Sequence, residues 1–284
     1  MKNKNAVFIM LSILVMVVAF VIVKEVIPIV NENNSKNRIF NEFDGQISEL
    51  EKSIIGIIPK NESGEYTSYT SIGSGVIFEK QANRYYAITA LHVVDYVNST
   101  FKAFTRNTNF SGEIIQPDNK INFMIPDEKY YSSLLDLNVE YKSEATDLAI
   151  VIFTSDEELP VLEFETNNLN IGDKIICIGH PEGKRYVTTY GYITSNLKDS
   201  SYVTNISKIK IHDKVIEHNA YMNHGNSGGA AINENLKLVG INVGGSFSLL
   251  KHYKKGYMIP YDIVQKNINE WRNKKWKNYL VELI

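Results

Sequence analysis

From residue 53 onward, apolar and β-branched residues occur in short runs separated by turn-forming residues. Runs of this length and spacing are typical of an all-β barrel or sandwich. In the first half of this region we predict strands at residues 54–58, 71–78, 85–89, 114–115 and 148–153. In the second half we predict strands at 172–179, 187–193, 230–232 and 238–243 and a ribbon around 202–211. The pattern therefore predicts an all-β region.

Two flanking segments show helical spacing instead. The apolar residues Ile39, Phe40, Phe43, Ile47 and Leu50 predict a short amphipathic helix, which would pack on the strands or join copies of the chain. Beyond residue 260, a second apolar stripe predicts a closing helix; it consists of Ile263, Val264, Ile268 and Trp271. Basic residues follow this stripe, and we expect them to form a solvated helix face rather than to contact an anionic surface.

The longest apolar stretch lies at the N-terminus. Residues 6–23 carry no charge and contain a single serine as their only polar residue. As a helix they would span about 27 Å, against a hydrocarbon core of roughly 30 Å. The absence of an Ala-x-Ala site favours an uncleaved membrane anchor over a signal peptide. Lys2 and Lys4 precede the stretch, whereas Lys24 and Glu25 cancel after it, so we expect the remaining chain on the outer side. The polar, asparagine-rich residues 31–38 then predict a linker.

Composition and charge narrow the function classes. A chain of 284 residues, 44% of them hydrophobic, is long enough to bury a sizeable core. The net charge of −2 gives no argument for a nucleic-acid partner. Cys177 is the only cysteine and lies in a predicted strand, so we expect a core residue without an internal disulfide. No metal-ligand spacing or nucleotide-binding glycine loop occurs, so we expect no cofactor.

The pentapeptide Gly225-Asn226-Ser227-Gly228-Gly229 suggests a nucleophile. Acyl transfer needs an oxygen that attacks a carbonyl and N–H donors aimed at the oxyanion that develops. Glycines let the backbone approach a substrate closely, so Ser227 would attack while the N–H groups of Gly225 and Ser227 bind the oxyanion. An ordinary turn is the alternative interpretation of this segment.

A serine nucleophile also requires a base and an orienting carboxylate. His92 follows an aromatic and β-branched run that predicts a strand ending just before it. Asp147 precedes an apolar strand, where we expect a half-buried carboxylate suited to holding an imidazole tautomer. Taken alone, His92 would more often be a core histidine and Asp147 a strand-end cap. Their occurrence together with the pentapeptide favours catalysis.

With these residues in the order His, Asp, Ser, the chain resembles trypsin-like serine proteases over about residues 53–271. Within that family it is most similar to the bacterial HtrA (DegP-like) proteases. The similarity lies in the segments Gly73-Ser74-Gly75-Val76-Ile77, Thr89-Ala90-Leu91-His92-Val93-Val94, Thr146-Asp147-Leu148-Ala149-Ile150, Ile178-Gly179-His180-Pro181 and Gly240-Ile241-Asn242. Glutamyl endopeptidases are less similar, because a histidine usually stands in them where this chain has Asn242.

The resemblance implies two six-stranded antiparallel β-barrels, chymotrypsin-like, with a C-terminal helix. We therefore expect a membrane anchor at residues 1–30, a linker and short helix at 31–52, and a protease domain at 53–284. Within the protease domain, the expected parts are a first barrel at about 53–165, a second at about 166–260 and a helix at about 261–284. The long segment 95–145 would form extended loops around a few strands.

The function that the resemblance implies is peptide-bond hydrolysis through an acyl-enzyme. Ser227 would attack, His92 would transfer the proton, Asp147 would orient His92, and the oxyanion hole would comprise Gly225, Asn226 and Ser227. Substrate backbone would pair near residues 243–246, and the substrate-binding residues would be Tyr221, Met222, Asn242, Val243 and Gly244. Because none of these is acidic, we expect a preference for a small or medium apolar residue rather than a basic one.

Two departures from the family patterns bear on mechanism. Asn226 stands where trypsin has an aspartate that captures a new N-terminus, so we expect no activation by that route. His224 stands where HtrA proteins usually have a proline, which leaves the shape of the oxyanion loop, about residues 217–226, open. We expect the His224 side chain to face solvent rather than substrate.

The resemblance also suggests partners and location. We expect protein or peptide substrates, a single-pass protein of the bacterial envelope with an extracytoplasmic protease domain, and a role in protein quality control or processing. The chain ends before the PDZ domain that usually follows in HtrA proteins, so we expect no peptide-end recognition of that kind. Assembly into a homo-oligomer stays open. The alternative functions are a latent binding module with a protease fold and a serine esterase.

Overall fold

The computed structural model describes residue 15 and residues 44–63, 66–69, 73–109, 128–203, 210–247 and 253–282. The chain divides into two compact units, Met1–Gly45 and Gln46–Ile284, and the second unit contains the strands described below. No helix within the described ranges is long and apolar enough to cross a membrane. Apart from residue 15, the predicted anchor at 6–23 lies outside the described residues, as do the linker at 31–38 and the start of the amphipathic helix at 39–43.

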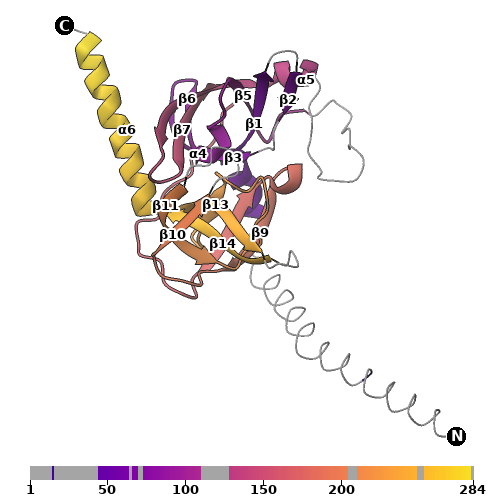
Figure 1. The fold of residues 1–284 in the computed structure, drawn as a ribbon, viewed down its shortest axis with the longest axis vertical. Coiled ribbons are helices and arrows are strands. Elements are labelled where there is room, and N and C mark those ends of the chain that lie inside the picture. Colours follow the sequence, from indigo (N-terminus) through magenta and orange to yellow (C-terminus); the bar gives the residue numbers. More distant parts are fainter. Residues whose placement is uncertain are drawn as a thin grey trace, which may run out of the picture. The chain divides into compact units, whose positions relative to one another are not determined.

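The first sheet has seven antiparallel strands and closes into a barrel (Figure 1). Its strands are β1 (Ile54–Ser63), β2 (Tyr66–Tyr69), β3 (Gly73–Gln81), β4 (Arg84–Ala90), β5 (Ser99–Phe104), β6 (Leu135–Ser143) and β7 (Leu148–Thr154). They follow the order β2-β1-β3-β4-β7-β6-β5, and β1 also pairs with β5. This extra pairing closes the six strands β1, β3, β4, β7, β6 and β5, while β2 extends the hairpin of β1. The prediction of a six-stranded first barrel is confirmed.

The second sheet also has seven antiparallel strands, in the order β10-β11-β14-β13-β12-β8-β9. The strands are β8 (Lys174–Gly179), β9 (Val187–Tyr192), β10 (Lys198–Val203), β11 (Lys210–His218), β12 (Ala230–Ile232), β13 (Leu238–Phe247) and β14 (Tyr253–Pro260). An isolated bridge between Ile193 and His218 is the link between β9 and β11, and the N–H of Thr194 donates to the carbonyl of Glu217 at 2.8 Å. The sheet therefore forms a half-barrel, where the resemblance implied a second closed six-stranded barrel.

Each sheet encloses its own apolar core. In the first, Ile54, Ile57, Ile77 and Ile88 are fully buried. In the second, the buried cluster contains Ile175, Cys177, Ile193, Ile216, Ala220, Met222, Ala231, Val239 and Met258. The inward-facing side chains of each sheet are removed from contact with water, and this burial of apolar surface is the main stabilising contribution to the fold.

In the described part of the chain, two short helices precede the first strand, and three lie between strands. They are α3 (Asp44–Leu50), η3 (Glu51–Ser53), α4 (Leu91–Val94), α5 (Glu128–Ser133) and η4 (Pro181–Gly183). Ile47 of α3 is buried, as its place in the predicted amphipathic helix requires. Among the predicted strands, residues 114–115 lie outside the described residues. The structure adds β5 and β6 within the segment expected to be mostly loop.

The long helix α6 (Tyr261–Glu282) closes the domain, as predicted. Val264, Ile268 and Trp271 are buried, and the Trp271 ring contacts Phe78 of β3 and Tyr86 of β4 with centroid distances of 5.9 and 5.0 Å. The Trp271 end of the predicted apolar stripe therefore packs against the first barrel.

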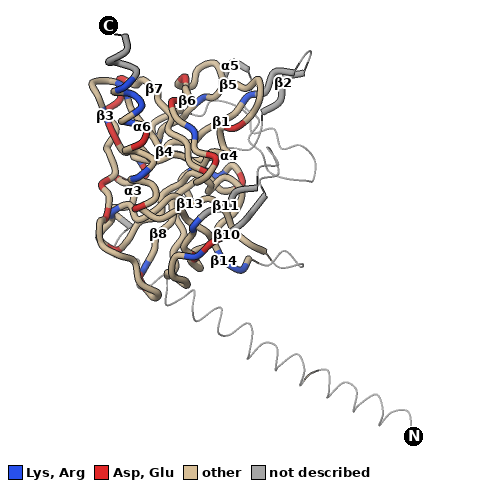
Figure 2. The backbone as a smooth tube through the Cα atoms, turned by 60° about the vertical axis from the view of Figure 1, so that its left-hand side comes forward, with Lys and Arg blue, Asp and Glu red and all other residues tan. Residues whose placement is uncertain are grey.

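Basic residues gather in the C-terminal half of α6 (Figure 2). Arg272 pairs with Glu79 at 2.5 Å, and Lys275 donates to the hydroxyl of Tyr86 at 2.8 Å. Lys274 lies 5.0 Å above the ring of Tyr141. These three cations contact the first barrel and are still exposed, in agreement with the expected solvated face.

Candidate active site

The ends of two neighbouring strands bring His92 and Asp147 together. Strands β4 and β7 pair with Ala90 opposite Leu148, so His92 follows one strand end and Asp147 precedes the other. The N–H of Leu91 donates to the carbonyl of Asp147 at 2.8 Å, which joins the two turns. Asp147 has a φ of 45°, a left-handed conformation that aspartate adopts more readily than most residues. The backbone therefore places the carboxylate beneath the histidine.

The Asp147 carboxylate accepts two hydrogen bonds from His92. Its Oδ2 lies 2.7 Å from the ring Nδ1, and its Oδ1 accepts the backbone N–H at 3.0 Å. Asp147 is fully buried, not half-buried as expected, whereas the His92 side chain is 17% exposed. Because an ionised carboxylate only accepts hydrogen bonds, we assign the ring proton to Nδ1. This tautomer leaves a lone pair on Nε2, as a general base requires.

The loop that contains Ser227 is docked against the first barrel. The carbonyl of Ser227 accepts the N–H of Ser74 at 2.9 Å, and the N–H of Gly228 donates to the carbonyl of Asn242 at 2.7 Å. Gly228 has a φ of 81°, and a Cβ there would lie 2.0 Å from the carbonyl oxygen of Ser74 and 2.2 Å from Oγ1 of Thr89. Only glycine fits this position, which lies against the end of the strand that leads into His92.

The Ser227 hydroxyl itself donates to the carbonyl of Val243 at 3.3 Å. Among the described residues, no hydrogen bond joins Ser227 Oγ to His92. Transfer of the hydroxyl proton to His92 therefore requires Oγ to leave the Val243 carbonyl. Rotation about one side-chain bond is enough for this change, and hydrogen bonds of free active sites often tighten only with substrate bound.

The loop before Ser227 turns tightly and leaves two backbone N–H groups without a partner among the described residues. Gly225 has a φ of 103°, and the carbonyl of the buried Asn226 accepts the N–H of Gly229 at 2.9 Å. Within the described part of the chain, no hydrogen bond uses the N–H of Gly225 or Ser227. Two backbone donors are therefore unoccupied beside the nucleophile, which an oxyanion needs. The side chain of His224 is exposed, in agreement with its expected orientation.

Met222, which was expected to contact the substrate, is buried in the core of the second sheet. It is 1% exposed, and its Cγ lies 2.7 Å from the position that a Cβ on Gly256 would take. Its Cβ lies 3.3 Å from the same position on Gly245. Tyr221 is 44% exposed, and its ring packs on Tyr253 with a centroid distance of 5.1 Å. Met222 is therefore a core residue, and none of these three side chains is acidic or basic.

Asn242 lies in the core rather than at an exposed position. Its Nδ2 donates to the carbonyl of Ala230 at 2.8 Å, and its Oδ1 accepts from the Cys177 thiol at 3.6 Å. Burial lowers the pKa of His218, which hydrogen-bonds with Asn242, to about 4. Burial also raises the pKa of Cys177 to about 12. These groups are neutral at neutral pH, and the thiol is unreactive, as its place in a strand suggested.

Sequence reasoning assigned no role to Ser74 and His180, which both contact the oxyanion loop. The signal was present, because both lie in segments that carry the family resemblance. In the part of the chain that the structure describes, no group of histidine, cysteine and carboxylate residues has the arrangement of a metal site.

Comparison with known proteins agrees with this geometry. The profile of the trypsin-like peptidase domain matches residues 73–241. The chain is 30% identical to a probable periplasmic serine endoprotease, DegP-like, from Rickettsia conorii over 191 residues, which are 66% of this chain and 31% of the relative. It is 27% identical to the serine protease Do-like HtrA of Bacillus subtilis over 223 residues, 73% of this chain and 43% of the relative.

A serine protease HtrA-like from Staphylococcus aureus is 27% identical over 232 residues, 80% of this chain and 26% of the relative. The chain thus spans between about a quarter and two fifths of the length of these relatives.

Proposed function

Because the chain belongs to the trypsin-like peptidase family, we propose that it is a serine endopeptidase that hydrolyses peptide bonds through an acyl-enzyme. The observation that carries this proposal is the pair of hydrogen bonds from His92 to the buried Asp147 carboxylate. A buried carboxylate that accepts both the backbone N–H and the ring Nδ1–H fixes the position and the tautomer of the imidazole at once. Such an arrangement is needed for a base and is not needed for a core histidine.

In the proposed mechanism, Ser227 Oγ attacks the carbonyl carbon of the substrate while His92 Nε2 takes its proton. His92 returns this proton to the leaving amine as the C–N bond breaks, which leaves an ester on Ser227. Water then attacks the ester while His92 takes a proton from it. The carboxylic acid product is released, and His92 returns the proton to Ser227. Asp147 remains ionised throughout and stabilises the imidazolium that forms in each step.

The oxyanion of each tetrahedral intermediate would bind to the N–H groups of Gly225 and Ser227. Both donors are unoccupied among the described residues, and Asn226 joins them in one buried loop. Donors of this kind act on charge that develops only in the transition state, so they raise kcat.

Substrate backbone would pair with β13 beyond Asn242. There β13 pairs with β14 on one side, whereas its pairing with β12 covers only residues 238–241. Gly244 has no atom within 4 Å of the position of a Cβ, so an extended peptide has room beside it. The buried Met222 and the rings of Tyr221 and Tyr253 favour a small or medium apolar side chain at the cleaved bond.

We also propose that residues 6–23 anchor the protein in the membrane of a bacterial envelope, with the protease domain extracytoplasmic. The support is the uncharged composition of these residues and the excess of lysine before them. The periplasmic assignment in the name of the Rickettsia relative agrees with an envelope location. Envelope protein quality control or processing would then supply the protein substrates.

The activity is tested by incubating the full-length chain with unfolded casein and with a peptide library, and by identifying the cleaved bonds by mass spectrometry. We expect cleavage by the wild type and none by Ser227→Ala. Matched ester and peptide substrates separate the esterase alternative, because an esterase would turn over only the esters. Binding of casein without cleavage by either protein would favour the latent binding module.

The anchor is tested by membrane fractionation followed by alkaline carbonate extraction. We expect the full chain to stay in the membrane pellet and a chain that begins at Ile39 to be soluble. Release of the full chain by carbonate, or an N-terminus that begins after residue 23, would contradict an uncleaved anchor.

A further inference from the structure

Two residues outside the oxyanion loop hold the carbonyl of Gly225. The hydroxyl of Ser74 donates to this oxygen at 2.7 Å, and the backbone N–H of His180 reaches it at 3.4 Å. The preceding carbonyl, that of His224, accepts the N–H of Glu182 at 2.7 Å. Since the C=O and N–H of a trans peptide point in opposite directions, the bond to Glu182 also orients the N–H of Gly225. The backbone of residues 180–182 thus holds two successive carbonyl groups of the oxyanion loop by hydrogen bonds.

The hydroxyl of Ser74 connects the carbonyl of Gly225 with the buried imidazole of His180. Its oxygen lies 2.9 Å from Nδ1 of His180. Because the hydroxyl donates its single hydrogen to the carbonyl of Gly225, it must accept a hydrogen bond from His180, which therefore carries its hydrogen on Nδ1. The Nε2 of His180 is buried and has no hydrogen-bond partner among the described residues. Burial, with a smaller contribution from the charge of Arg185, lowers the pKa of His180 to about 3, so the ring is neutral at neutral pH.

Aromatic residues fix the plane of the His180 ring. The ring packs edge-on against Phe104 and Tyr186, with centroid distances of 4.9 and 4.7 Å. Phe104 is the last residue of β5 in the first barrel, and Tyr186 lies just before β9 in the second sheet. The orientation of His180 therefore depends on both halves of the domain.

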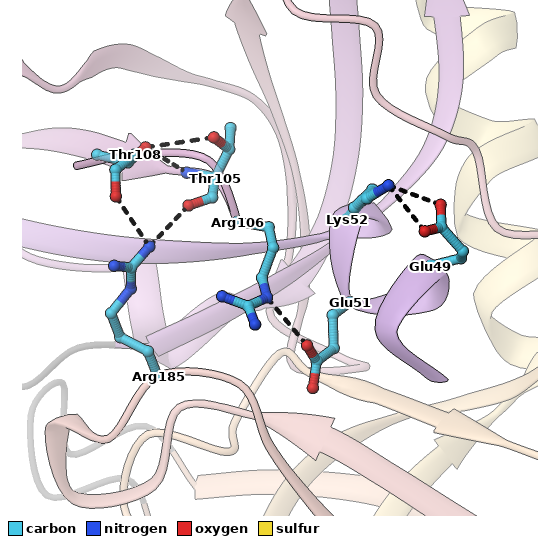
Figure 3. Close-up of polar contacts among 7 residues, drawn as sticks. All are labelled: Glu49, Glu51, Lys52, Thr105, Arg106, Thr108 and Arg185. Atoms are coloured by element: carbon cyan, nitrogen blue, oxygen red, sulfur yellow. Dashed lines mark hydrogen bonds and ion pairs between the residues drawn. The ribbon is translucent and has the colours of Figure 1, made fainter. Parts of the chain in front are cut away.

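Arg185, which lies just before β9 of the second sheet, donates hydrogen bonds to the first barrel (Figure 3). Its Nη2 donates to the carbonyl oxygens of Thr105 and Thr108, at 3.0 and 3.2 Å, in the turn that follows β5. Its guanidinium also lies 5.3 Å from the centre of the Phe104 ring. Arg185 and His180 thus contact the same ring of Phe104, and His180 in turn contacts the oxyanion loop.

We propose that His180 is a positioning residue for the oxyanion loop, acting through Ser74 on the carbonyl of Gly225, and that Arg185 fixes it from the end of β5. This inference rests on the proposed peptidase activity. Its consequence is kinetic, because the oxyanion exists only after the substrate carbonyl has been attacked. Loss of the orientation therefore lowers kcat and leaves KM nearly unchanged.

The test measures kcat and KM for peptide cleavage by the full-length chain. His180→Leu keeps the bulk of the side chain but removes the Nδ1 donor, and we expect kcat to fall by about 10- to 100-fold, less than the loss of a whole oxyanion donor. Ser74→Ala should cause a similar fall. The double variant should be no slower than the slower single variant, since the two residues act as one unit.

His180→Asn provides the conservative rescue, because its amide N–H lies close to where Nδ1–H stood. We expect it to retain most of the wild-type kcat. Arg185→Met keeps the stem of the side chain and loses both hydrogen bonds, so kcat should fall less than in His180→Leu. Tyr85→Phe is the matched control: it removes a buried hydroxyl that accepts the N–H of Leu159 at 3.2 Å, at the end of β4 remote from His92. It should lose thermal stability and keep its kcat.

Three results would overturn the inference: an unchanged kcat in His180→Leu, an equal loss in His180→Asn, or a loss that appears in KM alone. If His180→Leu does not fold, Ser74→Ala decides, because an unchanged kcat there refutes the relay through the hydroxyl. Failure of the wild type to cleave any peptide would instead contradict the proposed function, so the two failures are distinguishable.

Discussion

Replacement of Asp147 by asparagine isolates the role of its charge, because the side chain keeps its shape. In the wild type, both oxygens accept a hydrogen from His92, one from the backbone N–H at 3.0 Å and one from ring Nδ1 at 2.7 Å. Asparagine offers one oxygen and one NH₂ group. The backbone N–H of His92 cannot change its role, so the asparagine oxygen should remain on it and the NH₂ group should face the ring.

An NH₂ group beside Nδ1 needs a lone pair there, so the imidazole must move its proton to Nε2. The nitrogen that should receive the Ser227 proton is then occupied. The alternative orientation of the amide would place NH₂ against a buried backbone N–H, which costs roughly 1–3 kcal/mol. For a triad with the wrong tautomer, kcat falls by about 10⁴-fold. This fall corresponds to about 5.4 kcal/mol of lost transition-state stabilisation.

The assay compares kcat and thermal unfolding of Asp147→Asn with those of the wild type on one peptide substrate. Asp136→Asn is the matched control, because it makes the same chemical change in the same barrel at a side chain that is 86% exposed. The control should keep the wild-type kcat. A folded Asp147→Asn variant that retained more than about a tenth of the wild-type kcat would refute the assigned tautomer and its role.

Three further predictions follow from packing and charge. Gly228→Ala should slow cleavage by about 100-fold or more, because a Cβ 2.0 Å from the carbonyl of Ser74 must displace Ser227; an unchanged kcat would contradict this contact. Trp271→Ala should lower the free energy of unfolding in urea by about 3–5 kcal/mol, without changing kcat of the folded protein. Stability should fall as pH drops from 6.5 towards 4, because the pKa of His218 is lowered to about 4 in the folded protein and is near 6.5 in the unfolded one. Only the unfolded chain takes up this proton, and His218→Gln should flatten the slope of thermal unfolding against pH.

The strands that sequence alone predicted best are those with continuous apolar runs. The strand predicted at residues 148–153 is β7, which extends one residue further, and the strand predicted at 230–232 is β12 with the same bounds. Strand β14 (Tyr253–Pro260) was not among the predicted strands, because its first half contains two lysines and a glycine; it forms a hairpin with β13, in which Tyr253 lies opposite Phe247. The closure of the first barrel through β1 and β5 was equally hidden, since pairing register between distant strands leaves no local signal.

For the candidate site, sequence named residues but not their geometry. The motifs pointed to His92, Asp147 and Ser227, and the structure brings the first two into direct contact. The left-handed backbone of Asp147 and the bond from Ser227 to Val243 depend on the folded surroundings of each residue. Sequence reasoning also gave His180 no role, because its contacts with Ser74 and with the carbonyl of Gly225 arise only in the folded chain.

The most direct test of an activated serine is covalent labelling by a fluorophosphonate, followed by mass spectrometry of the modified peptide. The probe reacts with a serine whose proton is taken by a positioned base, and the oxyanion donors bind the phosphoryl oxygen of the probe. We predict that the full-length wild type is labelled on Ser227 and that Ser227→Ala and His92→Ala are not labelled. A folded wild-type protein that stays unlabelled, or a label on another serine, would contradict the proposed nucleophile.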